Sequence, residues 1–245
     1  MLALQRDLAA ERLSDRSGSD LLLLVEHDPV LTIGRGSQAS DLIVDRVWLE
    51  RRGMEVVVVE RGGDITFHGP GQLVGYPVFD LAAHRRDLHW YLRRLEEALL
   101  QGTAACGLTG GCRVEGHTGI WRAAAGVLPD AVQRDSQANG FPAVGATAAG
   151  PAVREHRLRK LASIGVHVSR WITRHGFALN VTDEPLAAFE AIVPCGIPGV
   201  AMTSLRSEGV EASPDQIRRE VVRGVVKAFG FAQTASTSGH TAGPG

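Results

Sequence analysis

A glycine-rich stretch contains the densest group of polar side chains suited to ligand contact in this 245-residue chain. It reads R-G-G-D-I-T-F-H-G-P-G-Q over 61–72 and joins two apolar runs. Glycine lets backbone N–H groups approach a ligand, while Arg61, His68 and Gln72 place directed polar groups at fixed offsets. A tight interstrand turn would explain the glycines, but it would not need the polar side chains. We therefore expect a substrate-contacting loop.

This loop does not match the usual phosphate-binding patterns. A Walker A loop requires Lys-Ser/Thr after its last glycine, and this stretch lacks that pair. Neither the loop nor Gly34-Arg35-Gly36 fits the dinucleotide pattern G-x-G-x-x-G. We therefore expect no nucleotide or other cofactor.

Lysine is rare in this chain, because Lys160 and Lys227 are the only lysines among 26 basic residues. Lysine, unlike arginine, can shift its pKa and exchange a proton near neutral pH. Lys227 lies in the last turn of an expected helix, where a cation meets the negative end of the helix dipole. Lys160 begins an apolar segment, 161–168, that is typical of a strand. Lys160 is thus a candidate for proton transfer, with chance survival of two lysines as the alternative.

The cysteines are Cys106, Cys112 and Cys195, without a C-x-x-C pair. Their spacing favours neither a disulfide framework nor a zinc site, so we expect a reduced, cytoplasmic protein without a metal. Cys106 follows an amphipathic helix and is interpreted as a packing residue, whereas Cys112 lies in a glycine-rich turn and has no assigned role. Cys195 lies among prolines and glycines in V-P-C-G-I-P over 193–198. It is the candidate nucleophile, with a structural role as the alternative.

Cys195 and Lys160 could act as a pair in acyl transfer. A thiol with its ordinary pKa of about 8.5 is mostly protonated at neutral pH, and a nearby ammonium favours the attacking thiolate. A neutral lysine could then accept the proton of an incoming amine, a task closed to arginine at a pKa above about 12. Transfer from a thioester to an amine is downhill and needs no ATP.

Composition limits the class of protein. A net charge of −1 and a hydrophobic content of 44% describe a globular chain with one large core. We expect one domain over 1–233 and a flexible tail over 234–245. Scattered charges argue against nucleic-acid binding. The apolar runs over 21–25 and 56–59 are too short to cross a membrane, and the charges within 1–15 exclude a signal peptide.

Helical and strand patterns alternate along the chain. Leu88, Tyr91, Leu92, Leu95, Ala98 and Leu99 share the spacing of one buried helix face. A final helix begins at Ser213-Pro214-Asp215, with an N-cap and a proline in its first turn. The segment over 123–153 lacks periodicity and is expected to be an exposed insertion. A further helix is expected over 2–13, and strands over 21–25, 30–33, 56–59, 73–79, 161–168 and 177–181. Adjacent strands with flanking helices indicate an α+β mixed sheet.

Four motifs together resemble a known family, the lipoyl(octanoyl) transferases of the LipB type. The resemblance rests on R-G-G-D-I-T-F-H-G-P-G-Q-L-V-G-Y at 61–76, K-L-A-S-I-G-V at 160–166, H-G-F-A-L-N at 175–180 and P-C-G-I at 194–197. It implies the catalytic-domain fold of lipoate and biotin protein ligases. The chain departs from that family in lacking a tyrosine-containing strand ahead of 2–13 and in its long segment between Trp121 and Lys160.

The resemblance also implies an activity, the first step of endogenous protein lipoylation. An octanoyl or lipoyl group would pass from acyl carrier protein to a lysine of the lipoyl domains of 2-oxoacid dehydrogenase E2 subunits or of the glycine-cleavage H protein. Cys195 would hold the acyl group as a thioester and Lys160 would lower its pKa. The residues implied to surround the acyl substrate are Arg61, Gly62, Gly63, Asp64, Ile65, Thr66, Phe67, His68, Ser163, Ile164, Gly165, Gly176, Phe177 and Ala178.

Other interpretations stay open from the sequence. An ATP-dependent lipoate or biotin ligase would share the fold but form an acyl adenylate without a nucleophilic cysteine. An inactive member would only bind lipoyl domains or acyl carrier protein, and the presence of Lys160 and Cys195 argues against it. Ile164 and Phe177 fit an acyl tunnel and a packed core equally well. A basic set is either a solvated face or a rim that steers an acidic carrier protein; it comprises Arg154, Arg157, Arg159, Arg170 and Arg174.

Overall fold

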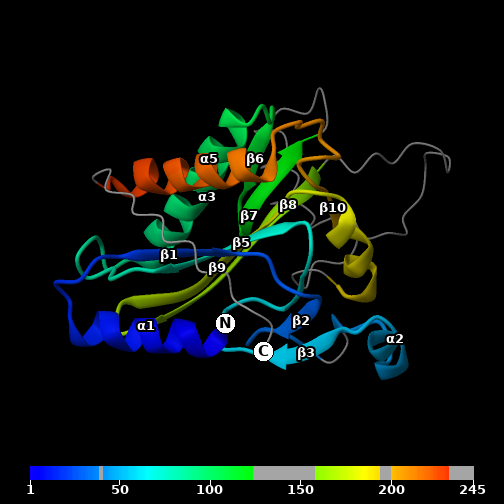
Figure 1. The fold of residues 1–245 in the computed structure, drawn as a ribbon, viewed down its shortest axis with the longest axis horizontal. Helices are drawn as coiled ribbons and strands as arrows, with labels where there is room; N and C mark the ends of the chain where they lie inside the picture. Colours follow the sequence, from blue (N-terminus) through cyan, green and yellow to red (C-terminus); the bar gives the residue numbers. More distant parts are fainter. Residues whose placement is uncertain (39–40, 124–157, 194–199, 232–245) are drawn as a thin grey trace.

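The computed structural model describes residues 1–38, 41–123, 158–193 and 200–231. These residues form a seven-stranded sheet and a three-stranded sheet with flanking helices (Figure 1). Both parallel and antiparallel pairs occur, which confirms the predicted α+β fold with a mixed sheet. The expected tail over 234–245 and the insertion, apart from Ala123, lie outside the described residues.

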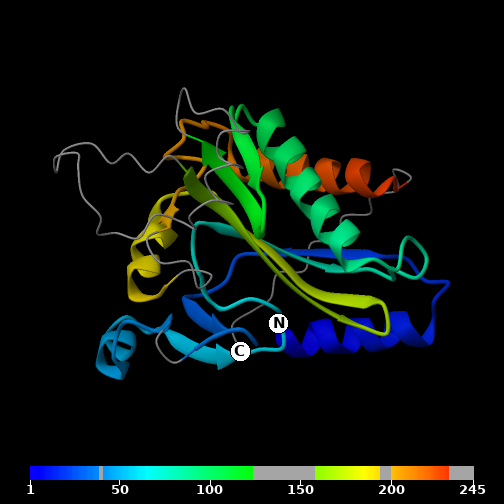
Figure 2. The same cartoon turned by 180° about the vertical axis from the view of Figure 1, so that it is seen from behind.

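The large sheet has the order β1-β5-β9-β8-β7-β6, with the short β10 paired to β8. Helices α3 (Leu88–Ala105) and α5 (Pro214–Phe229) cover one face, while α1 (Leu2–Ser14) lies on the other (Figures 1 and 2). The strands are β1 (Leu21–Val25), β5 (Gln72–Val78), β6 (Gly111–Val114), β7 (His117–Ala123), β8 (Leu158–Ser169), β9 (Ile172–Asn180) and β10 (Ala201–Met202).

The small sheet lies on the same side of the large sheet as α1 (Figure 2). Its central strand β2 (Val30–Ile33) pairs in parallel with β3 (Glu55–Val58) and antiparallel with β4 (Ile65–His68). Its core packs against a 3-10 helix, η2 (Glu184–Ala191), and is flanked by α2 (Arg46–Arg51). The chain therefore has two sheets that can enclose a site between them.

The main core lies between the large sheet and helices α3 and α5. Tyr91, Leu95, Ala98 and Leu99 are buried, as the helical spacing predicts, while Leu88 is 42% exposed at the first position of α3. The two helices approach closely, because a Cβ on Gly224 would lie 2.2 Å from the carbonyl oxygen of Ala98. Only glycine permits that contact.

Helix α5 begins as its sequence predicts. The Ser213 side chain accepts a hydrogen bond from the Gln216 N–H, and Pro214 occupies the first turn. The helix ends at Gly230, whose φ of 72° is left-handed. Local capping chemistry therefore sets both ends of α5.

Three local expectations differ from the structure. Strands β8 and β9 are longer than predicted. The gap between the two predicted strands, 169–176, indicates a hairpin-like connection, and in the structure the turn contains only Arg170 and Trp171, at φ of 51° and 69°. The sequence does not mark this short turn, because it lacks the glycine or asparagine that usually accompanies positive φ. Cys112 lies in β6 and not in a turn, and β1, whose unbroken apolar run predicts a buried strand, is only partly buried.

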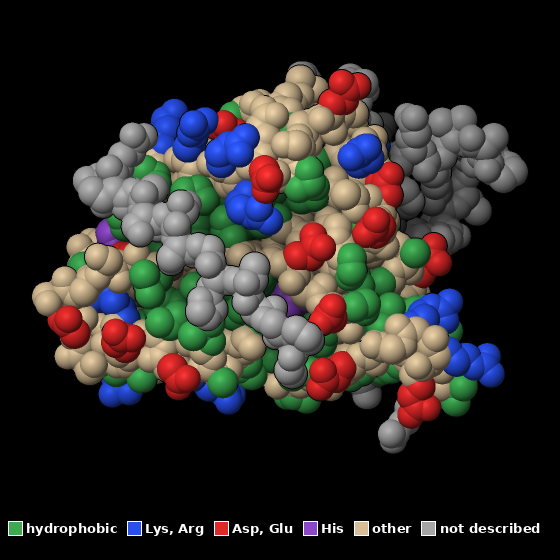
Figure 3. Space-filling view, in the orientation of Figure 1, with side chains coloured by type: hydrophobic (Ala, Val, Ile, Leu, Met, Phe, Trp, Pro, Cys, Tyr) green, Lys and Arg blue, Asp and Glu red, His purple; other side chains and the backbone are tan. Residues whose placement is uncertain are grey.

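Of the helices that the structure describes, none has the length and apolarity needed to span a membrane. Figure 3 shows acidic and basic side chains interspersed over the visible face, in agreement with the scattered charges of the sequence.

Candidate active site

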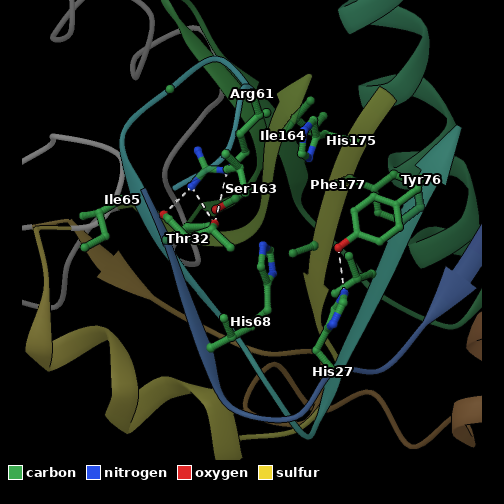
Figure 4. A pocket seen from close by; sticks show the side chains of 18 of the residues that line it. His27, Thr32, Arg61, Ile65, His68, Tyr76, Ser163, Ile164, His175 and Phe177 are labelled. Atoms are coloured by element: carbon green, nitrogen blue, oxygen red, sulfur yellow. Dashed lines mark hydrogen bonds between the residues drawn. The ribbon is translucent and has the colours of Figure 1, made fainter. Parts of the chain in front are cut away.

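A cavity of about 620 Å³ lies between the small sheet and the large sheet. Strands β2, β3 and β4 supply one wall, and β5, β8 and β9 supply the other (Figure 4). The residues predicted for the site that line this cavity are Arg61, Gly62, Gly63, Asp64, Ile65, Thr66, His68, Lys160, Ser163, Ile164, Gly165, Gly176, Phe177 and Ala178. Tertiary structure thus brings together three segments, 61–68, 160–165 and 176–178, the first and last of which lie more than a hundred residues apart in sequence.

Phe67 is a predicted site residue that does not line the cavity. Alternate residues of a strand face opposite sides, so Thr66 and His68 face the cavity and Phe67 faces away. The Phe67 ring packs in the core of the small sheet, with its centroid 6.1 Å from that of Phe189. Phe67 therefore supports the strand that presents its two neighbours.

Cys195 lies outside the described residues, which end at Val193 and resume at Val200. Shortly after this gap, Met202 of β10 pairs with Lys160 of β8. The Thr203 N–H then donates a hydrogen bond to the Lys160 carbonyl oxygen at 2.9 Å. The chain that follows Cys195 in sequence is thus joined directly to the backbone of Lys160.

The Arg61 side chain is buried and anchored to β2. Its Nη2 donates to the carbonyl oxygen of Thr32 at 2.7 Å and to Thr32 Oγ1 at 2.8 Å. The Gly62 N–H donates to the Val166 carbonyl oxygen at 2.9 Å, which ties the loop to β8. A Cβ on Gly165 would lie 2.9 Å from the Gly62 carbonyl oxygen. Gly165 therefore allows the loop and β8 to approach closely, and it also lines the cavity.

Lys160 is 2% exposed and lines the cavity from β8. Its Nζ lies 5.0 Å from the centroid of the Trp121 ring on β7, within the range of a cation–π contact. Gly119 lies beside it at a φ of 108°, where a Cβ would be 3.2 Å from Lys160 Cε and 2.2 Å from the Ala162 carbonyl oxygen. Two residues of the neighbouring strand β7 therefore lie against the Lys160 side chain.

The cavity lining also includes residues that were not predicted from sequence, among them His27, Thr32, Tyr76 and His175. The Nε2 of His27 lies 2.7 Å from the Tyr76 hydroxyl. The His27 and His68 ring centroids are 5.8 Å apart, and those of Tyr76 and His175 are 6.5 Å apart. Tyr76 lies two residues after Val74 along β5, and residues two apart in a strand share one face of the sheet, so this spacing could have placed Tyr76 beside Val74 in the cavity wall. His27 offered no comparable local signal.

Burial lowers the pKa of the cavity histidines and so favours their neutral form. Burial and the nearby Arg61 charge lower the pKa of His68 to about 3 and that of His175 to about 4. Burial also lowers the pKa of His27 and raises the pKa of the Tyr76 phenol. The aromatic polar groups therefore act as uncharged hydrogen-bonding groups beside the Arg61 guanidinium.

The two described cysteines lie outside the cavity lining. Cys106 and Cys112 are buried, and burial raises the pKa of each thiol. The packing role predicted for Cys106 agrees with this environment. Across the described ranges, no group of His, Cys, Asp and Glu side chains could hold a metal ion.

Of the five residues of the basic set, the structure describes Arg159, Arg170 and Arg174. Arg159 is the second residue of the twelve-residue strand β8, and Arg170 follows its last residue. The Arg159 Nε lies 2.8 Å from Glu208 Oε1 in an ion pair, and Arg174 lies 3.9 Å from Glu60. Arg154 and Arg157 lie outside the described residues. These contacts indicate that Arg159 stabilises the fold.

Comparisons with known proteins agree with the resemblance in sequence. The family model of the lipoyl protein ligase A/B catalytic domain matches residues 1–226. An octanoyltransferase from Synechococcus elongatus is 45% identical over 232 residues, which cover 95% of this chain and 80% of that protein. An octanoyltransferase from Acidobacterium capsulatum is 42% identical over 236 residues, covering 94% and 83%.

Solved structures show the same fold at low sequence identity. A bi-partite lipoate protein ligase from Thermoplasma acidophilum matches with a TM-score of 0.61 at 17% identity, covering 92% of this chain and 78% of that chain. A lipoate-protein ligase A bound with ATP matches with a TM-score of 0.58 at 18% identity, covering 92% and 80%. From the family model and the sequence relatives, we conclude that the chain belongs to the lipoyl protein ligase A/B catalytic-domain family, alongside proteins named octanoyltransferase.

Proposed function

We propose that this protein is a cytoplasmic octanoyltransferase that transfers an octanoyl or lipoyl group through a thioester on Cys195. The observation that carries the proposal is the burial of Lys160 in the cavity that also collects the 61–68 loop and the β8 and β9 motifs. The names of the sequence relatives support the same activity. The donor is octanoyl acyl carrier protein, and the acceptors are lipoyl domains of E2 subunits and the glycine-cleavage H protein.

In the first step, the Cys195 thiolate attacks the carbonyl carbon of the donor thioester. A new carbon–sulfur bond forms, the bond to the carrier sulfur breaks, and the departing thiolate takes a proton from the Lys160 ammonium, which leaves Lys160 neutral for the second step. The positive charge of Lys160 favours the thiolate form of Cys195 before attack. Because one thioester replaces another, this step is nearly thermoneutral.

In the second step, a neutral lysine amine of the acceptor domain attacks the Cys195 thioester. The carbon–nitrogen bond forms, the carbon–sulfur bond breaks, and the Cys195 thiolate is restored. The amine must lose a proton, and Lys160 in its neutral form accepts it. Amide formation makes the overall transfer downhill without ATP.

Apolar cavity walls would bind the acyl chain. Ile164, Phe177, Ala178 and Val74 line the cavity, and the tip of the Phe177 ring lies against Gly75 of β5, where a Cβ would be 2.1 Å from Phe177 Cζ. Burial of an alkyl chain contributes about 0.8 kcal/mol per CH₂. Chain burial therefore supplies much of the affinity for the octanoyl group.

Intact mass spectrometry after incubation with octanoyl acyl carrier protein tests the proposal. We expect one added octanoyl group that maps to Cys195. The variants Cys106→Ser and Cys112→Ser should still become acylated, whereas Cys195→Ser should not and should lose transfer activity. A Cys195→Ser variant with parental turnover would contradict the covalent mechanism.

The second candidate function is ATP-dependent lipoate or biotin ligation, because the fold also matches that of a lipoate-protein ligase A bound with ATP. The two functions differ in their need for nucleotide. Octanoyl transfer in the absence of ATP supports the transferase, and transfer of free octanoate that requires ATP supports the ligase. Binding of lipoyl domains without any turnover would instead indicate an inactive binding module.

A further inference from the structure

Four buried polar groups form a chain that leads from the core to the cavity. Asn180 Nδ2 donates to the Thr203 carbonyl oxygen at 2.9 Å, and Gln72 Nε2 donates to Asn180 Oδ1 at 2.9 Å. Gln72 Oε1 lies 3.3 Å from His68 Nδ1. Gln72 and Asn180 are each 1% exposed, so these groups must satisfy one another.

The chemistry of the chain end sets the direction of every hydrogen bond. The Thr203 carbonyl oxygen can only accept, so Asn180 must turn its NH₂ group toward it and its oxygen toward Gln72. Gln72 must then donate to that oxygen, which leaves its own oxygen for His68. A carbonyl oxygen cannot donate, and His68 Nδ1 must therefore carry the proton.

His68 has only one ring proton at physiological pH. Burial, together with the Arg61 charge, lowers the pKa of His68 to about 3. Because the single proton is on Nδ1, the Nε2 atom has a free lone pair and can only accept a hydrogen bond. The ring points from β4 into the cavity (Figure 4).

The backbone explains why Gln72 reaches His68. The Gln72 N–H donates to the Gly69 carbonyl oxygen at 3.2 Å, which closes a turn over the H-G-P-G-Q motif. Gly71 in this turn has a φ of 84°, and a Cβ there would lie 2.1 Å from Thr182 Oγ1. Gln72 is also directly opposite Asn180 in the β5–β9 pairing. The turn and the sheet register together bring the side chains of His68, Gln72 and Asn180 into line.

We propose that Gln72 and Asn180 are positioning residues that hold His68 as its Nδ1–H tautomer, so that Nε2 accepts a hydrogen bond from the attacking amine. The proposal rests on the proposed octanoyl transfer. A neutral amine has N–H groups at its attacking atom, whereas the donor thioester has none at its reacting carbon. A hydrogen bond to Nε2 would hold the amine in the cavity that Lys160 also lines, and Lys160 takes the proton. The hydrogen-bonded chain from Thr203 to His68 therefore acts only in the second step, the attack of the amine.

Nitrogen NMR of the ¹⁵N-histidine-labelled protein reads the tautomer without any need for activity. In the parent protein, we expect His68 Nδ1 to be protonated and Nε2 to be unprotonated. Gln72→Met removes the acceptor and should shift the ring toward Nε2–H. Gln101→Met makes the same change on α3, outside the cavity, and should leave His68 unchanged.

Single-turnover kinetics then test the role in transfer. Gln72→Met should form octanoyl-Cys195 at the parental rate but transfer it to a lipoyl domain about tenfold more slowly, in line with the loss of one hydrogen bond of about 1.4 kcal/mol. Detection of Nε2–H on His68 in the parent would contradict the proposed Nδ1–H tautomer, whether or not Cys195 becomes acylated. Equal slowing of both steps in Gln72→Met would overturn the amine-positioning role.

Discussion

The Nζ of Lys160 lies over the face of the Trp121 ring, 5.0 Å from its centroid. The two residues are opposite each other in the β7–β8 pairing and therefore share one face of the sheet. Both are fully buried. This relationship places a lysine side chain at a defined position in the cavity wall, where a charged and a neutral form would serve different steps of acyl transfer.

Lys160→Arg should separate those two steps. Arginine keeps the positive charge that favours the Cys195 thiolate, but it cannot become neutral and accept the amine proton. We expect octanoyl-enzyme to form while transfer to a lipoyl domain falls by about 100-fold or more, as for loss of a general base. Rapid-quench mass spectrometry measures both rates. Lys227→Arg, on α5, is the matched control, and unaltered transfer in Lys160→Arg would remove the proton-accepting role.

Gly119→Ala should displace Lys160 and destabilise the protein. The substitution combines a left-handed backbone with a Cβ 2.2 Å from the Ala162 carbonyl oxygen. We expect a loss of about 2 to 3 kcal/mol in the free energy of unfolding and a slower transfer. Gly116→Ala also has positive φ, at 77°, but nothing lies within 4 Å of its Cβ. Urea unfolding of both variants isolates the contact, and equal losses would show that backbone strain alone matters.

Arg61→Lys should not behave as a conservative change. The guanidinium contacts both the carbonyl and the hydroxyl oxygen of Thr32, and a single ammonium cannot reproduce that paired geometry. We expect a loss of about 1 to 3 kcal/mol in stability and a higher KM for octanoyl acyl carrier protein. Thr32→Val removes the hydroxyl contact but keeps the carbonyl contact, so it should cost less. A KM unchanged in Arg61→Lys would make the anchor purely structural.

Acidification should destabilise the protein through its buried histidines. The unfolded chain binds protons near the ordinary pKa of 6.5, while His68 and His175 titrate in the folded protein at about 3 and about 4. The unfolded state thus binds more protons in this range, and stability present above pH 6.5 is lost as pH falls.

Denaturant unfolding between pH 6.5 and 4.5 should show a loss on the order of 2 kcal/mol for each of these histidines. His175→Asn tolerates the positive φ of that position and should flatten the pH dependence. His89→Asn, at an exposed position, is the control. A parental slope in His175→Asn would contradict the lowered pKa.

Alkylation should distinguish the three cysteines. Cys106 and Cys112 are buried thiols with raised pKa values, so they contain little of the reactive thiolate at neutral pH. We expect iodoacetamide to modify Cys195 at least about tenfold faster, with peptide mapping as the measurement. Prior incubation with octanoyl acyl carrier protein should protect Cys195 alone. Faster labelling of Cys106 would argue against an activated Cys195.

Local signals predicted much of the architecture. The N-cap and proline of α5, the buried stripe of α3 and the glycine-rich loop depend on residues that are neighbours in sequence or one helical turn apart. Those interactions can be read from spacing, because the backbone geometry of a helix or a turn dictates which side chains meet. The two lysines were likewise distinguished by sequence context, and Lys160 lies in the cavity wall as its motif implied.

By itself, the sequence determined the types of the reacting groups and the strands and helices that present them. Tertiary structure decided which way each side chain faces and what it meets: Phe67 turns from the cavity to the core, and His27 joins Tyr76 across 49 positions of the chain. The contact between Gln72 and Asn180 spans 108 positions. Such pairs arise from sheet register and from the stacking of two sheets, and no local periodicity encodes either of these.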